Sequence, residues 1–117
     1  MHPNKRQGHD YEQQAWQYLA AQGLTLVAQN VYCKGGEIDL IALDGATLVI
    51  IEVKYRRNAD FGYAQEYVTA RKQQALQRCA QRFLQKHPQY QNAPLRFDIL
   101  SQTGTQISWL KNAFGGW

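Results

Sequence analysis

The sequence is poor in cysteine and has no long apolar run. Its two cysteines, Cys33 and Cys79, are too few for a disulfide framework and lack metal-type spacing, so we expect reduced thiols. The longest apolar stretch, residues 47–53, contains a glutamate and is far shorter than the roughly 18 residues that a membrane span needs. No apolar signal core follows the basic residues 1–6. We therefore expect a cytoplasmic protein with no membrane partner.

The histidines and glycines form no motif that is typical of a metal, catalytic or phosphate-binding site. The three histidines, His2, His9 and His87, form no ligand motif and are expected at the surface. The glycine pairs at 35–36 and 115–116 are typical of turns and do not form a glycine-rich phosphate loop. Any catalytic site is therefore expected to use other side chains.

The length and the charge distribution are informative about the class of protein. With 117 residues, 44% of them hydrophobic and 19% charged, the chain is expected to form a single domain over 1–117, with 1–8 and 111–117 flexible or peripheral. Residues 37–52 contain four acids and no base, whereas residues 54–96 contain nine bases and two acids. This order suits a cation site within a surface that attracts a polyanion, although a solvated basic helix face would give the same counts.

Hydrophobic periodicity predicts two helices and five strands. The predicted order is a helix over His9–Gln22 that stops at Gly23, strands over Leu24–Tyr32, Glu37–Leu43 and Thr47–Tyr55, a helix from the cap Thr69 to His87, and strands over Leu95–Ser101 and Gln106–Leu110. Residues Tyr63–Val68 are ambiguous. This order indicates an α/β or α+β fold.

The two central strands are predicted to form a hairpin that brings acids together. If Asp44 and Gly45 form a type I′ turn, Leu43 pairs with Ala46, and Glu37 lies opposite Glu52. One face then carries Glu37, Asp39, Glu52 and Lys54, and both faces are otherwise apolar. Asp39 and Glu52 would be diagonal neighbours on that face.

These clustered carboxylates indicate a candidate metal site. An oxygen-only ligand set suits Mg²⁺ or Mn²⁺ rather than zinc. The alternative is a ladder of Glu–Lys ion pairs at the solvated end of the sheet. A turn with one more residue would move Asp39 and Glu52 to opposite faces, so the inference depends on the register.

At these positions the sequence resembles a known family. Residues 36–41 (GEIDLI) and 51–56 (IEVKYR) resemble the PD-(D/E)xK nuclease signature. The wider pattern resembles the YraN family, small bacterial proteins that are similar to Holliday-junction resolvases. It includes Gly8, Glu12, Gly23, Asn30, Phe61-Gly62, Val68, Lys72 and Arg96-Phe97-Asp98.

The resemblance implies a restriction-endonuclease-like fold, in which helices cover both faces of a mixed sheet of about five strands in the order αβββαββ. It also implies roles for individual residues. Asp39, Glu52 and Lys54 match the catalytic residues, and Glu12, Asp39 and Glu52 match the metal-binding acids, with Mg²⁺ or Mn²⁺ as cofactor. The basic residues expected to face nucleic acid are Arg56, Arg57, Arg71 and Lys72.

Three functions follow as hypotheses. The first is a metal-dependent endonuclease that hydrolyses phosphodiester bonds of DNA, including branched or Holliday-junction DNA, in which two copies could pair on a two-fold junction. The second is a nucleic-acid-binding accessory module that keeps the nuclease fold without cleaving. The third is a structural protein stabilised by metal. Retention of Asp39, Glu52 and Lys54 together favours the first, because acids repel phosphate and a mere binder would tolerate their loss.

Overall fold

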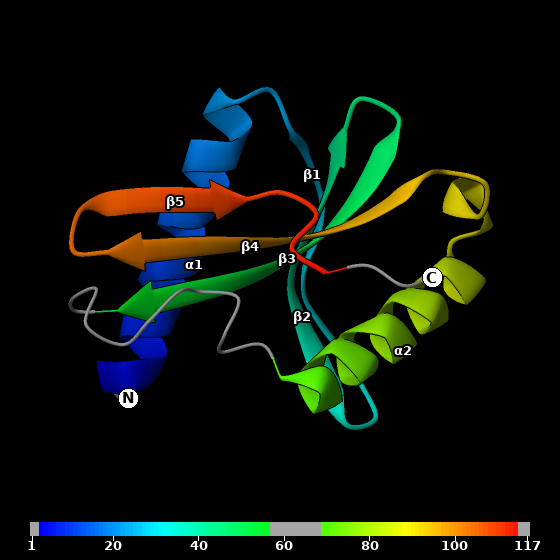
Figure 1. Ribbon diagram of the computed structural model, residues 1–117, viewed down its shortest axis with the longest axis horizontal. Coiled ribbons are helices and arrows are strands. Elements are labelled where there is room, and N and C mark those ends of the chain that lie inside the picture. Colours follow the sequence, from blue (N-terminus) through cyan, green and yellow to red (C-terminus); the bar gives the residue numbers. More distant parts are fainter. Residues whose placement is uncertain (1–2, 57–68, 115–117) are drawn as a thin grey trace.

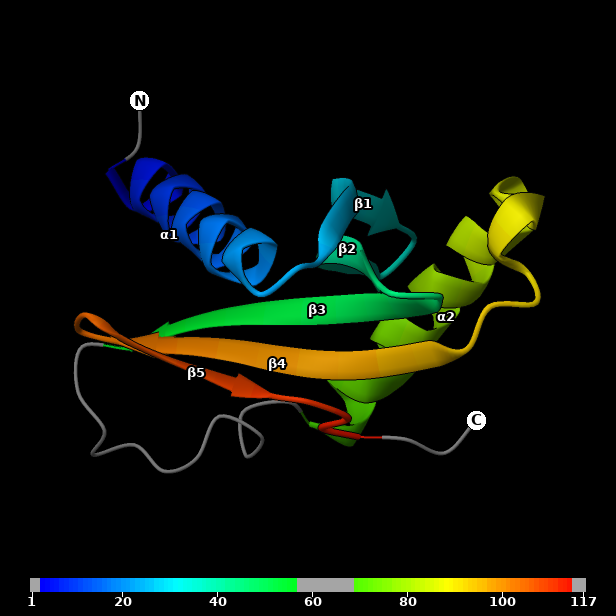
Figure 2. The same cartoon turned by 90° about the horizontal axis from the view of Figure 1, so that it is seen from above.

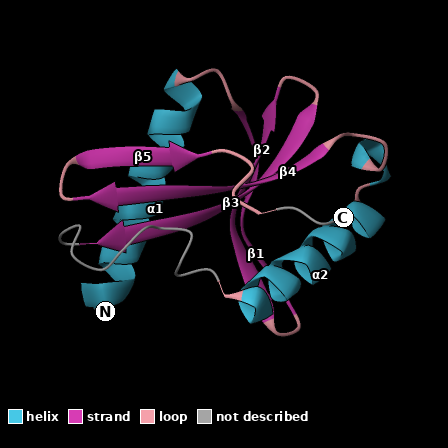
Figure 3. Ribbon diagram, viewed as in Figure 1, coloured by secondary structure: helices cyan, strands magenta, loops and turns pink. Residues whose placement is uncertain are grey.

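The protein folds around one mixed sheet with a helix on each face. The computed structural model describes the backbone of residues 3–56 and 69–114 and the side chains of residues 11–55 and 69–114. The five strands lie in the order β1-β2-β3-β4-β5, with β3 and β4 parallel and the other neighbours antiparallel. Helix α1 lies behind the sheet and α2 lies in front of it (Figures 1 and 3).

The order of elements confirms the restriction-endonuclease-like arrangement αβββαββ that was predicted. The elements are α1 (Pro3–Ala21), β1 (Thr25–Cys33), β2 (Gly36–Asp44), β3 (Thr47–Arg56), α2 (Ala70–Lys86), a 3₁₀ turn (Pro88–Tyr90), β4 (Leu95–Thr103) and β5 (Gln106–Leu110). Helix α1 begins six residues earlier than the apolar periodicity indicated. The ambiguous segment Tyr63–Val68 lies outside the described residues.

Each face of the sheet has its own hydrophobic core. On the α1 face, Leu19 packs with Leu40 and Ile51, whereas on the α2 face Phe83 packs with residues that include Ile50 and Phe97. Figure 2 shows the sheet between the two helices. The prediction that β2 and β3 are central strands, covered on both sides, is therefore confirmed.

The helix boundaries follow the signals in the sequence. The Thr69 hydroxyl accepts a hydrogen bond of 3.2 Å from the backbone N–H of Lys72 and so caps α2, as predicted. Gly23 follows α1 with a φ of +96°, a conformation that favours glycine. Within residues 3–56 and 69–114, neither helix is long and apolar enough to cross a membrane.

The register of the central hairpin differs from the predicted one by two residues. Asp44 pairs with Thr47 and Leu43 with Leu48, so the two turn residues are Gly45 and Ala46. Only Gly45 has a positive φ (+62°), as in a type II′ turn. Asp44 stays in the strand, where its carboxylate contacts Arg96 at 2.9 Å. A shift of two residues leaves every side chain on the same face.

The predicted alternation of faces in β2 is wrong near Asp39. Ile38 packs in the α2-side core together with Ile41, although residues three apart in a regular strand face opposite ways. Leu40 packs in the α1-side core. The change occurs in the part of β2 that precedes Leu40. The last β2–β3 pair is Leu40 with Ile51, so this part of β2 pairs with β1 alone. Glu37 therefore lies opposite Tyr32 of β1 and not opposite Glu52.

The expectation of two reduced thiols is also wrong, because Cys33 and Cys79 form a disulfide. Their Cα atoms lie 5.5 Å apart, although 46 residues separate them in the sequence. The end of β1 meets the middle of α2 here, and Gly36, paired with Cys33, allows the helix to approach closely. A Cβ at Gly36 would lie 3.2 Å from the Cys79 Sγ. Spacing along the chain could not reveal this contact.

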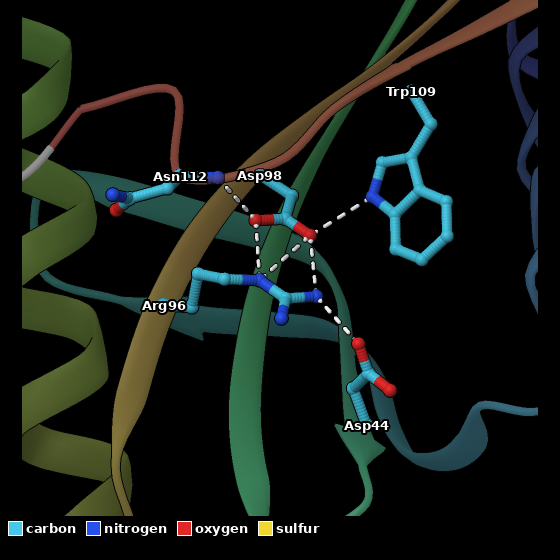
Figure 4. A network of polar contacts seen from close by, with 5 residues as sticks. All are labelled: Asp44, Arg96, Asp98, Trp109 and Asn112. Atoms are coloured by element: carbon cyan, nitrogen blue, oxygen red, sulfur yellow. Dashed lines mark hydrogen bonds and ion pairs between the residues drawn. The ribbon is translucent and has the colours of Figure 1, made fainter.

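A buried carboxylate joins β4 to the hairpin turn and to the end of β5 (Figure 4). Asp98, only 1% exposed, accepts hydrogen bonds of 2.9 Å from the Trp109 Nε1 and from the backbone N–H of Asn112. The Arg96 guanidinium donates to Asp98 at 2.9 Å and also to Asp44 at 2.9 Å. All of these groups are satisfied together, so the network fixes the strands that support the site.

Candidate functional site

The candidate site lies where β2 and β3 part. The two strands are paired only between the hairpin turn and the pair Leu40–Ile51. In Figure 1 the beginning of β2 lies near the start of α2, whereas the end of β3 lies on the opposite side of the sheet, in front of α1. The Asp39 carboxylate accepts a hydrogen bond of 2.8 Å from the backbone N–H of Val53. This contact holds Asp39 beside the following strand at the point of divergence.

Glu52 is the most buried acid of the site, with 5% of its surface exposed. Lys72 of α2 contacts its Oε1 atom at 2.6 Å, and Lys54 of the same strand contacts it at 3.4 Å. Two ammonium groups therefore compensate one buried carboxylate, which is the condition under which burial of a charge is tolerated. Lys72 reaches this position because it lies in the first turn of α2.

Glu12 and Glu37 bring two further carboxylates to Asp39. One oxygen atom of each of these three residues lies within 4.8 Å of the others. With its nitrogen oriented toward the acids, the Asn30 amide donates to Glu12 Oε2 at 3.0 Å and to Glu37 Oε1 at 3.2 Å. Asn30 adopts a left-handed backbone conformation (φ +53°), which asparagine tolerates better than most residues.

Helix α1 is positioned at the site by an aromatic pair. The rings of Tyr11 and Tyr55 stack with centroids 3.7 Å apart and planes 10° from parallel. Tyr11 precedes Glu12 on the helix, and Tyr55 follows Lys54 on β3. The stack therefore attaches the helix that carries Glu12 to the strand that carries Glu52 and Lys54.

The electrostatics of Asp39 reflect this crowding of like charges. Burial, followed by the negative charge of Glu52, raises the pKa of its carboxyl from 3.8 to about 7. The Val53 N–H opposes the shift, while Glu12 and Glu37 add to it. A carboxyl that would be half protonated near neutral pH indicates that the cluster has too little positive charge around it.

The two lysines of the site are shifted in opposite directions. Burial lowers the pKa of Lys54, and the adjacent Lys72 ammonium lowers it further. Burial also lowers the pKa of Lys72, but its contact with Glu52 outweighs burial and leaves that pKa raised. At the edge of the cluster, the negative charge of Glu37 raises the pKa of the exposed Tyr32 phenol. Lys72 is thus the firmly charged partner of Glu52.

The residues present fit a hard divalent cation. The donors that converge are carboxylate oxygens, the ligand type that Mg²⁺ and Mn²⁺ prefer. The negative charges of Glu52, Glu12 and Glu37 all raise the pKa of Asp39. A cation near Asp39 would relieve the repulsion that raises this pKa.

The structure brings most of the predicted site residues together and separates others from them. Asp39 lies in the carboxylate cluster with Glu12, and its pKa is raised by the neighbouring Glu52, which pairs with Lys54. Glu52 itself is not one of the three clustered carboxylates. Lys72, expected to face nucleic acid, contacts Glu52 directly. Arg71 is exposed on α2. Arg56 is the last residue of β3 and its side chain, like all of Arg57, lies outside the described part of the chain.

Two residues of the site, Glu37 and Asn30, were not among the metal-binding acids that the family resemblance implies. The predicted alternation of β2 placed Glu37 opposite Glu52, but the structure pairs it with Tyr32 of β1 and brings its carboxylate to Glu12 and Asp39. Asn30 orients Glu12 and Glu37, and its presence in the family pattern was the available signal.

Comparison with known proteins identifies relatives over nearly the whole chain. The profile of the Uncharacterised protein family UPF0102 matches residues 11–101. A UPF0102 protein of Pseudomonas putida strain GB-1 is 47% identical over 114 residues, which cover 93% of each chain. One from Pseudomonas fluorescens is 47% identical over 109 residues, 92% of this chain and 91% of the relative. One from Klebsiella pneumoniae is 45% identical over 113 residues, 96% and 88% respectively.

Proposed function

This chain belongs to the UPF0102 family, which confirms the resemblance to YraN proteins, and we propose that it is a metal-dependent endonuclease that hydrolyses phosphodiester bonds of DNA. The observation that carries the proposal is the convergence of Asp39, Glu52 and Lys54 where β2 and β3 part. The raised pKa of Asp39 supports a cation at this place. The resemblance to resolvases makes branched DNA the first substrate to test.

The residues divide the work of hydrolysis between them. Asp39 and Glu52, together with Glu12, would hold Mg²⁺ or Mn²⁺, which supplies Lewis-acid polarisation of a phosphoryl oxygen. Lys54 lies 3.4 Å from Glu52, close enough to position a water molecule and to offset negative charge on the phosphate. Lys72 holds the Glu52 carboxylate in place at 2.6 Å. No thiol or imidazole is needed.

The test compares cleavage of labelled four-way-junction, duplex and single-stranded DNA in Mg²⁺, Mn²⁺ or EDTA. Glu52→Gln keeps the shape of the side chain and removes the charge that would bind a cation. We expect metal-dependent cleavage by the wild type and a loss of about a hundredfold or more in the variant. Asp44→Asn, at the far end of the same hairpin, is the matched control and should still cleave.

The outcomes separate the hypotheses. Binding of DNA without cleavage in any metal would support the non-catalytic accessory module instead. Cleavage by Glu52→Gln at the wild-type rate would show that the site assignment is wrong. Asp39→Ala adds a second check, because it should abolish cleavage while leaving DNA binding intact or stronger, since a charge that repels phosphate is removed.

A further inference from the structure

A groove lies beside the candidate site, between α2 and the turn that joins β1 to β2. Its first part, of about 470 Å³, is lined by residues that include Gly36, Glu37, Arg71, Lys72 and Arg78. Its second part, of about 350 Å³, shares Arg78 with the first and continues along the helix. It is lined by Cys33, Lys34, Arg78, Gln81, Arg82 and Gln85. We call these two hollows together the α2 groove.

The α2 groove carries basic side chains along its whole length. Arg71, Arg78 and Arg82 occupy positions i, i+7 and i+11 of α2, a spacing that places them on one side of the helix. Lys34, in the β1–β2 turn, lines the second hollow together with Arg78 and Arg82. The second hollow contains three cationic residues, two glutamines and no acid among the described residues that line it.

These cations have no acidic partners among the residues that the structure describes. The ion pairs there involve Lys54, Lys72 and Arg96. The side chains of Lys34, Arg71, Arg78 and Arg82 are exposed and take part in none of them. A row of uncompensated positive charge in a hollow attracts a polyanion strongly, because the concave wall concentrates the field.

The groove is built from rigid parts. The Cys33–Cys79 disulfide joins β1 to α2 along it. At Gly36 a Cβ would lie 3.3 Å from the Cβ and 3.6 Å from the backbone oxygen of Ala75, so the strand end packs directly against the helix. The wall formed by α2 and the wall formed by the β1–β2 turn are therefore held at a fixed separation.

We infer that the α2 groove binds the phosphate backbone of the nucleic-acid strand whose scissile bond lies at the carboxylate cluster. The inference rests on the proposed function and adds the path of the strand. Glu37 belongs to the carboxylate cluster and also lines the end of the groove, and Lys72, which lines the same end, contacts Glu52, so the two sites are continuous. From Arg71 to Arg82 the helix spans roughly 16 Å. Over that length one strand of B-DNA carries about five phosphates.

The chemistry of the lining favours nucleic acid over an acidic protein. Protein interfaces are centred on aromatic or apolar anchors, and no aromatic side chain of the described residues lines either hollow. Arginine and glutamine side chains are common donors to phosphate oxygens. Because these contacts address the backbone alone, binding should depend on the shape of the DNA and not on its sequence.

The experiment measures the affinity of fluorescent four-way-junction and duplex DNA by anisotropy, in EDTA and over a series of salt concentrations. The variants are Arg78→Gln, Arg82→Gln and their combination. Lys111→Gln is the matched control, since it removes one exposed positive charge just after β5, outside the groove. Arg78→Lys with Arg82→Lys retains the charges and shows whether a loss of binding comes from charge or from altered folding.

Each groove arginine is expected to contribute one phosphate contact. Its loss should lower the affinity about eightfold near 0.1 M salt and reduce the slope of log K against log salt by about 0.9. The double variant should lose roughly 60-fold on the same basis, the lysine variant should recover most of this, and Lys111→Gln should change the affinity by less than about twofold.

Equal losses in Lys111→Gln and in the groove variants would overturn the inference, as would a wild-type chain that binds no DNA. Displacement of the DNA by poly-glutamate at similar concentrations would overturn it in favour of an acidic protein partner. Cleavage is scored separately. If the groove variants lose affinity and neither they nor the wild type cleave, the groove stands and the nuclease proposal fails. If the groove variants bind and cleave as the wild type does, the nuclease proposal stands and the groove inference fails.

Discussion

Replacing Asp39 by asparagine should stabilise the metal-free protein above neutral pH. The substitution keeps a carbonyl oxygen for the Val53 N–H and removes a charge that burial and Glu52 both disfavour. The pKa of Asp39 is raised from 3.8 to about 7. A shift of about three units corresponds to about 4 kcal/mol in the free energy of unfolding, as an upper bound, at 1.36 kcal/mol per unit. Partial exposure reduces this to about 2–4 kcal/mol.

The substitution should have no effect on stability at low pH and a stabilising effect at high pH. Below about pH 4 the carboxyl is protonated in both the folded and the unfolded chain, and its full contribution is present. Between pH 4 and pH 7 the folded protein holds a proton that the unfolded chain has released, so stability falls as the pH rises. Above about pH 7 the loss is complete. Asp39→Asn should therefore match the wild type near pH 4 and exceed it near pH 8.

The assay is urea denaturation followed by circular dichroism at about pH 4.5 and pH 8, in EDTA and in Mg²⁺. In Mg²⁺ the wild type should gain about 1.4 kcal/mol at ten times the dissociation constant, whereas the variant should gain less. Asp44→Asn is the contrasting control, because its carboxylate is paired with Arg96 at 2.9 Å and its loss should destabilise the protein. A variant no more stable than the wild type at pH 8 in EDTA would refute the reasoning.

Three further predictions concern the supports of the site. Reduction of the Cys33–Cys79 disulfide by dithiothreitol, or the substitution Cys79→Ser, should lower the free energy of unfolding by up to about 4 kcal/mol, because the disulfide joins residues 46 apart in the sequence. Urea denaturation with and without reductant measures this loss. Asp98→Ala should cost about 2–3 kcal/mol, since it removes the buried acceptor of the Trp109 and Asn112 N–H groups and leaves Arg96 with Asp44 alone. A Trp109→Phe variant with a loss near 1 kcal/mol separates the contribution of Trp109, and a thermal melt of Asp98→Ala close to that of the wild type would contradict this account. Thr69→Ala should lower the free energy of unfolding by about 1 kcal/mol, because it removes the hydroxyl that caps α2. Thr69→Ser retains a hydroxyl and is the control. If the denaturation curves of the two variants coincide, the cap is not the cause of the loss.

Much of the fold could be predicted from local signals. The apolar periodicities place all five strands within a few residues, and Thr69 and Gly23 mark helix ends because their chemistry acts on adjacent backbone. The hairpin register was wrong by two residues, since Asp44-Gly45 is a strong local turn signal that a distant contact overrides. Arg96 holds Asp44 in the strand from a position 52 residues away.

The candidate site was predicted only in part for a similar reason. Asp39, Glu52 and Lys54 belong to neighbouring strands, which the hairpin signal predicts. The structure holds Asp39 beside β3 through the Val53 N–H, although the pairing of β2 with β3 ends at Leu40 and Ile51. Glu12, Glu37 and Asn30 meet Asp39 through the packing of α1 and the divergence of β2 from β3. Family resemblance supplied Glu12. Strand alternation placed Glu37 in an acidic cluster, but opposite Glu52, whereas the structure places it with Glu12 and Asp39 and opposite Tyr32 of β1.

The order of helices and strands, the two-sided burial of the central hairpin and the three motif residues of the site all follow from the sequence alone. These features depend on interactions between residues close in the chain or on adjacent strands. Three others emerge only from packing in three dimensions: Lys72 compensates Glu52, Cys33 and Cys79 form a disulfide, and uncompensated arginines line a groove that ends at the carboxylates. Those contacts join α2 to β1, β2 and β3, and the way a helix packs on a sheet leaves no periodic trace in the sequence.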